Sequence, residues 1–94
     1  TANGWNVMQY AALVHMMAQV SGLEAGELVH VIADAHIYDR HVPVVEELIS
    51  RAPYEAPRLW LDPQITDFYA FTKTSLKLEG YRFHTLDQPI PVAV

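Results

Sequence analysis

The chain has 94 residues, a length that allows one domain at most. Its formal charge of −5, without any cluster of lysine or arginine, argues against a nucleic-acid polymer or an anionic membrane surface as partner. The absence of cysteine excludes disulfides, thiolate metal sites and a cysteine nucleophile within these residues. No signal peptide is visible and no apolar stretch is continuous enough to span a bilayer, so we expect a cytoplasmic protein.

The first predicted element is a helix that begins near Gly4 or Trp5, with Asn3 as its N-cap, and that is apolar on nearly every side from Asn6 to Val20. Such a pattern is typical of a helix surrounded by other structure. Hydrophobic residues make up 51% of the chain, which is rich for so small a protein. We therefore expect a subunit partner or further polypeptide to cover part of this surface. Gly22 suits the left-handed position that ends a helix.

The next stretch, from Gly26 to His41, is β-branched and apolar at its start and polar toward its end. We predict a central strand that leaves a core and delivers side chains to a site. Alternate residues of a strand share a face, so one face gathers the hydrogen-bonding groups. That face comprises His30, Ile32, Asp34, His36 and Tyr38.

The remaining sequence predicts four shorter elements. A helix runs from Val42 to Ser50, with Pro43 in its first turn, where the missing N–H is harmless. A strand follows at Arg58–Leu61, then one or two helical turns within Ile65–Phe71, then a strand beginning at Leu76. Together these elements predict an α+β fold with helices packed on a sheet.

The chain also carries a series of short motifs in a fixed order. They are Trp5-Asn6, Tyr10, His15-Met16, Gln19, Gly26, Asp34-Ala35-His36-Ile37-Tyr38, His41, Arg51, Pro57-Arg58-Leu59, Leu78-Glu79-Gly80-Tyr81 and Pro91-Val92-Ala93-Val94. One such motif is weak, but the ordered series is specific, and it resembles the C-terminal third of thymidylate synthases. The resemblance implies that residues 1–94 are the C-terminal segment of a thymidylate synthase domain, with a two-layer α+β fold of helices on a mixed sheet.

The family's activity is the reductive methylation of dUMP to dTMP by a homodimer, with methylenetetrahydrofolate supplying carbon and hydride and no metal required. The resemblance implies that Asn6 recognises uracil and that His36 and Tyr38 hold the deoxyribose 3′-hydroxyl. It assigns Ala93 and Val94 to the tail that closes over the folate. The chemistry agrees at Asn6, since a carboxamide accepts from N3–H and donates to O4 of uracil, whereas aspartate suits the related dCMP hydroxymethylases.

The family's cysteine nucleophile, phosphate-binding arginines and folate-binding acid have no counterparts here. We therefore expect the 94 residues alone to be inactive and to depend on upstream sequence. The alternative is a noncatalytic, truncated nucleotide-binding or dimerisation module.

The residues by themselves leave other interpretations open. Asn6 suits a hydrogen-bonding role at the start of a helix. His36 and Tyr38 suit a pair in the protein interior whose hydrogen bonds are made within the protein. The last residues suit a frayed terminus. Imidazole and carboxylate groups are also good zinc ligands, which raises the alternative of a metal site. Its ligands would come from His30, Asp34, His36 and His41.

Overall fold

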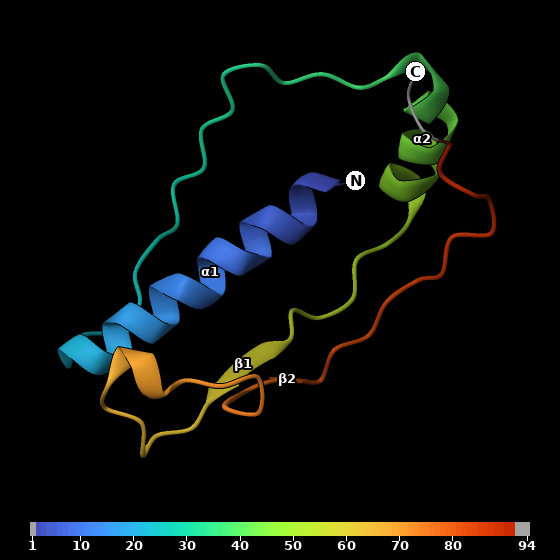
Figure 1. Ribbon diagram of the computed structural model, residues 1–94. Helices are drawn as coiled ribbons and strands as arrows, with labels where there is room; N and C mark the ends of the chain where they lie inside the picture. Colours follow the sequence, from blue (N-terminus) through green and yellow to red (C-terminus); the bar gives the residue numbers. More distant parts are fainter. Residues whose placement is uncertain (1, 92–94) are drawn as a thin grey trace. The chain divides into compact units, whose positions relative to one another are not determined.

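The structure, a computed structural model, describes the backbone of residues 2–91 and the side chains of residues 4–91 (Figure 1). Its elements are α1 (Ala2–Ser21), η1 (Asp39–His41), α2 (Val42–Ser50), β1 (Arg58–Leu61), η2 (Phe68–Ala70) and β2 (Leu76–Glu79). Helices with one sheet confirm the predicted α+β class. Residues 2–30 and 56–81 form one compact unit, and residues 31–55 and 82–91 form a second. We call them unit 1 and unit 2.

Helix α1 ends as the sequence predicts, at a glycine. Gly22 has φ of 69°, which is a left-handed conformation that costs a residue without a Cβ little. Its amide donates to the carbonyl of Gln19 at 3.2 Å, and the Leu23 amide donates to the carbonyl of Ala18 at 2.8 Å. These two bonds make a Schellman motif, which satisfies carbonyls that the helix end would otherwise leave unpaired.

The large apolar side chains of α1 remain exposed. Trp5 is 86% exposed, Tyr10 59% and Met17 50%, although the helix has apolar residues on every side. The described part of the chain therefore does not supply the surroundings that the sequence pattern predicts.

Within residues 2–91, no helix combines the length and the apolar character needed to cross a membrane.

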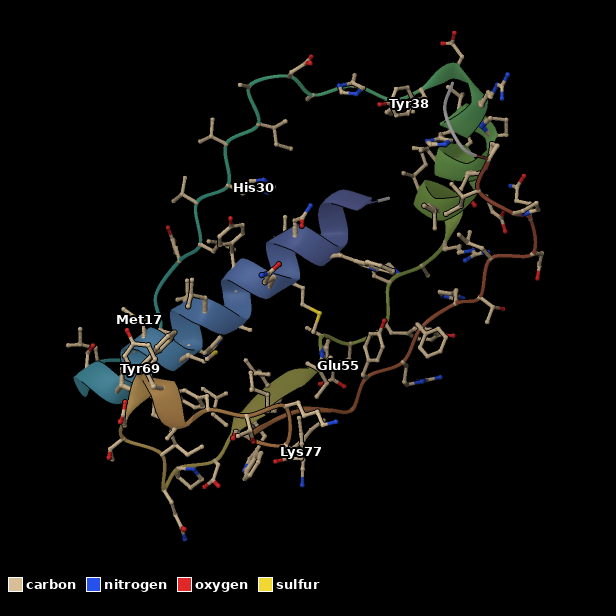
Figure 2. The ribbon with its side chains drawn as sticks, in the orientation of Figure 1. Met17, His30, Tyr38, Glu55, Tyr69 and Lys77 are labelled. Atoms are coloured by element: carbon tan, nitrogen blue, oxygen red, sulfur yellow. The ribbon has the colours of Figure 1, made fainter. Side chains whose placement is uncertain are left out.

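Unit 1 contains the only sheet within residues 2–91, a two-stranded antiparallel one. Strands β1 and β2 pair from Arg58 opposite Glu79 to Leu61 opposite Leu76. Trp60 lies opposite Lys77, whose Nζ is 5.1 Å from the centre of the indole ring, a cation–π distance. Figure 2 marks Lys77 on this sheet. Both strands lie where the sequence predicts them.

Gln19 connects α1 to the loop between the two strands. Its Nε2 donates to the carbonyl oxygens of Asp62 and Ile65, each at 2.9 Å. The loop is also held internally, because the Asp62 amide donates to the Ser75 carbonyl and the buried Ser75 hydroxyl accepts from the Thr72 amide. One glutamine thus ties the C-terminal half of the helix to the loop between β1 and β2.

The central strand predicted within the Gly26–His41 stretch, as far as Tyr38, is absent from the described residues. Residues 24–38 form neither helix nor strand, and Asp39–His41 is a short 3₁₀ helix. A strand exists through hydrogen bonds to a neighbour, and no backbone hydrogen bond joins residues 24–37 to any other described segment. Val29 is 78% and Val31 83% exposed, so these β-branched side chains are not covered as they would be in a sheet. The composition favours a strand, but no described segment pairs with it.

Unit 2 consists of η1, α2 and the segment of residues 82–91. Helix α2 begins at Val42 and ends at Ser50, as predicted, with Pro43 in its first turn. Val44 is 2% exposed and is the one buried apolar side chain of residues 4–91. Hydrogen bonds from residues 84–91 to α2 and its two ends hold the segment in place.

Candidate functional site

Two of the predicted site residues, His36 and Tyr38, contact each other in unit 2. Their ring centres lie 5.2 Å apart at an interplanar angle of 74°, an edge-to-face contact. Tyr38, marked in Figure 2, is 51% exposed, and the His36 side chain is 53% exposed. The sequence predicts a shared face from strand alternation, whereas the structure brings the two rings into contact on a segment that is not a strand. Both remain accessible to a ligand.

The His36 ring is oriented by the backbone of a neighbour. Its Nδ1 lies 2.9 Å from the carbonyl oxygen of Asp34. A carbonyl only accepts, so Nδ1 donates the proton, and Nε2 of the neutral ring is left as an acceptor. The Asp34 carboxylate is 3.7 Å from Nδ1 and its side chain is 94% exposed, which makes the ion pair weak. Within the described residues, Nε2 of His36 and the Tyr38 hydroxyl have no hydrogen-bond partner and are free to bind one.

Asn6, the third predicted residue, lines a pocket in unit 1. The pocket has a volume of about 230 Å³. Its walls are Asn6, Val7 and Tyr10 of α1 with Leu28, Val29 and His30. The carboxamide of Asn6 has no hydrogen-bond partner within residues 4–91, so both its donor and its acceptor are available. An apolar pocket with one free amide suits a flat, polar-edged ring.

His41 makes two contacts that the sequence does not predict. Its ring meets Tyr38 edge-on, with centres 5.4 Å apart and planes at 87°. Its Nε2 lies 2.6 Å from the carbonyl oxygen of Pro91, fifty residues further along. No local pattern signals this pairing, although His41 belongs to the motif series. Ala93 and Val94, the predicted folate-closing residues, lie outside the described residues.

A polar cluster between α2 and the final segment also escaped sequence analysis. Arg51 Nη2 donates both to the Glu47 carboxylate and, at 2.9 Å, to the Thr85 carbonyl. Gln88 Nε2 donates to the other carboxylate oxygen at 2.6 Å. The hydrogen bond from Gln88 and the charge and hydrogen bond of Arg51 lower the pKa of Glu47, against an opposing effect of partial burial. The sequence signals for it were the i,i+4 spacing of Glu47 and Arg51 and the place of Arg51 in the motif series.

The described residues offer no candidate metal centre. Within them, no group of three or more histidine, aspartate or glutamate side chains is arranged to hold an ion. Nε2 of His41 is already engaged by a carbonyl, and the Asp34 carboxylate extends into solvent.

Comparison with known proteins identifies the group to which this chain belongs. The family model described as thymidylate synthase matches residues 1–94. The chain belongs to the thymidylate synthase family. A thymidylate synthase from Clostridium beijerinckii is 48% identical over 82 residues, which cover 85% of this chain and 31% of that protein. One from Bacillus phage phi3T is 44% identical over 80 residues, covering 85% and 29% respectively.

A solved structure agrees with the sequence comparison. The thermostable thymidylate synthase A from Bacillus subtilis matches with a TM-score of 0.90 at 42% identity. The match covers 98% of this chain and 33% of that one. The fold is therefore that of a part of a thymidylate synthase, as the motif series predicts. The chain spans about a third of the length of the relatives it matches.

Proposed function

We propose that this chain is the C-terminal portion of a thymidylate synthase, which converts dUMP to dTMP with methylenetetrahydrofolate as the second substrate. The observation that carries the proposal is the family match over residues 1–94. The accessible contact between His36 and Tyr38 supports it, because free hydrogen-bonding atoms at a motif position suit ligand binding. In this assignment the chain contributes nucleotide recognition and the closing tail.

Asn6 is assigned to the uracil base. Its carboxamide accepts a hydrogen bond from N3–H and donates one to O4, whereas cytosine reverses both requirements. A site that leaves buried polar groups unpaired can reject the wrong ligand by a large factor. The free amide in an apolar pocket supports this role.

His36 and Tyr38 are assigned to the deoxyribose 3′-hydroxyl. With Nδ1 of His36 donating to the Asp34 carbonyl, Nε2 accepts from a sugar hydroxyl, while the Tyr38 hydroxyl donates to the same oxygen. A hydroxyl both donates and accepts, so one ligand atom satisfies both side chains. This arrangement positions the nucleotide and performs no bond-making step.

The tail residues Ala93 and Val94 are assigned to the folate. In the proposed enzyme they close over it and exclude water from the reaction. The nucleophile that adds to C6 of the pyrimidine has to come from polypeptide beyond these residues, since the sequence contains no cysteine. The complete enzyme is proposed to be a homodimer, and the exposed apolar side chains of α1 support burial against further polypeptide.

A chimera tests the proposal. Residues 1–94 would replace the matching third of the Bacillus subtilis enzyme, and tritium release from C5-labelled dUMP would be measured with methylenetetrahydrofolate. We expect release from the chimera and none from the 94-residue chain alone. A folded but inactive chimera beside an active parent enzyme would contradict the proposal, and would favour the noncatalytic module instead.

A further inference from the structure

The pocket around Asn6 contains a further polar side chain, His30, to which the proposed function gives no role. Asn6 and Tyr10 lie on the α1 wall of this pocket, and His30 lies on the wall formed by the segment that follows the helix. Within residues 4–91, the His30 imidazole has no hydrogen-bond or ion-pair partner. We infer that His30 is a positioning residue, which accepts a hydrogen bond from Asn6 and so holds its carboxamide against the base. This inference rests on the proposed function.

The hydrogen bonds that Asn6 makes to uracil leave one of its protons unused. Oδ1 accepts from N3–H, and one of the two Nδ2 protons goes to O4. The second Nδ2 proton lies in a pocket whose remaining walls include Val7, Leu28 and Val29. An N–H group that loses water without gaining an acceptor weakens binding, because its desolvation is not compensated. The complex therefore requires an acceptor near Asn6.

His30 supplies a better acceptor than Tyr10. A neutral imidazole has one nitrogen whose lone pair lies in the ring plane and is fully available, whereas the lone pair of a phenol oxygen is partly delocalised into its ring. Figure 2 shows the His30 side chain pointing from its segment toward α1. The pocket volume, about 230 Å³, is below the roughly 300–1,000 Å³ of sites for drug-sized ligands, so groups on both walls lie close to one small ring.

The same hydrogen bond fixes which way the carboxamide faces. A turn of 180° exchanges the oxygen and the nitrogen of Asn6, and a free amide has little preference between the two orientations. With Nδ2 bonded to His30, Oδ1 stays toward N3–H. Within the described residues no hydrogen bond joins Asn6 to His30, and bonds of this kind are often long in a free protein and shorten when a ligand binds. We therefore expect the bond to form in the nucleotide complex.

Variants of the chimera test the inference through the dissociation constant for dUMP, measured by equilibrium dialysis, and through kcat at saturating dUMP. His30→Phe keeps a ring but removes the acceptor, and His30→Gln restores an acceptor oxygen. Asn6→Ala, with and without His30→Phe, completes a double-mutant cycle. His15→Phe is the matched control, because His15 also lacks a hydrogen-bond partner within residues 4–91 but lines a different pocket.

We expect His30→Phe to weaken dUMP binding about fivefold, the factor that one hydrogen bond usually contributes, while kcat changes less than about twofold. His30→Gln should recover most of this affinity, and His15→Phe should change it less than about twofold. In the Asn6→Ala background, His30→Phe should change the affinity less than about twofold, because the proton that His30 accepts is gone.

Equal losses from His30→Phe in the two backgrounds would overturn the inference, and so would an unchanged affinity of the single variant. A loss that Tyr10→Phe reproduces and His30→Gln does not repair would overturn it as well. Each of these results leaves the proposed function intact. A parent chimera that binds no dUMP would overturn both.

Discussion

Urea denaturation of the 94-residue chain on its own tests whether its structure depends on polypeptide beyond it. The chain exposes 8056 Å² of accessible surface. A folded monomer of this mass exposes about 5,500 Å², so the excess is about 2,600 Å². Within residues 4–91, Val44 is the only buried apolar side chain and Ser75 the only buried polar one. The perturbation in this experiment is the separation of the chain from the further polypeptide of the proposed enzyme.

The size of the missing stabilisation follows from this surface. If roughly 55–60% of the excess is apolar, as on ordinary protein surfaces, about 1,500 Å² lacks burial. At about 25 cal/mol per Å² this amounts to about 37 kcal/mol of hydrophobic free energy. Whole domains are stable by only about 5–15 kcal/mol. The hydrophobic free energy that the isolated chain lacks is therefore larger than the net free energy of unfolding of a typical domain.

We expect the isolated chain to show no cooperative unfolding transition, as monitored by the fluorescence of Trp5 and Trp60 and by far-ultraviolet circular dichroism. The chimera should unfold cooperatively under the same conditions, because the added polypeptide covers the exposed apolar surface. A sharp transition of the isolated chain, with a urea m-value of about 1 kcal/mol/M or more, would refute this reasoning.

Three further predictions concern the free energy of unfolding of the chimera, measured by urea titration. Gln19→Ala removes two hydrogen bonds and should cost about 2 kcal/mol, while Gln9→Ala on the exposed face of α1 should cost little. Gly80→Ala places a Cβ at φ of 71° and should cost about 1–2 kcal/mol, whereas Gly4→Ala within α1 should not destabilise. The lowered pKa of Glu47 means that its ionised form stabilises the fold above the ordinary glutamate pKa. This stability is lost as pH falls through the lowered pKa. Glu47→Gln should therefore weaken the fold at pH 7 and flatten the pH dependence of stability below the ordinary glutamate pKa, and an unaltered pH profile would contradict this assignment.

Local chemistry was sufficient to predict most of the elements. Gly22 supplies the left-handed residue that ends α1, and Pro43 supplies a first turn that needs no amide donor. Alternation and turn residues were sufficient to locate β1 and β2. Each of these signals acts within a few residues, so a single sequence contains it in full.

The prediction of a central strand within the Gly26–His41 stretch was wrong for a physical reason. Amino-acid composition indicates how well a segment suits the strand conformation, but a strand forms only where a second strand is present to pair with it. Within the described residues no backbone hydrogen bond reaches residues 24–37 from another segment. The exposure of Val29 and Val31 indicates the same missing neighbours.

The candidate site was predictable only in part. The rings of His36 and Tyr38 are in contact, but the shared face was predicted from a strand that the structure does not form. The contact of His41 with Pro91 joins positions fifty residues apart, which no local periodicity can indicate. The roles of Asn6 and of the tail stay predictions that rest on the family motifs.

The most direct test of the central claim is the substrate preference of the chimera at Asn6. Tritium release would be measured with C5-labelled dUMP and with C5-labelled dCMP, for the parent chimera and for Asn6→Asp. We expect the substitution to lower kcat/KM for dUMP relative to dCMP by about a hundredfold or more, because the carboxylate cannot donate to O4 of uracil. The same preference in both proteins would contradict the claim that this chain recognises the pyrimidine.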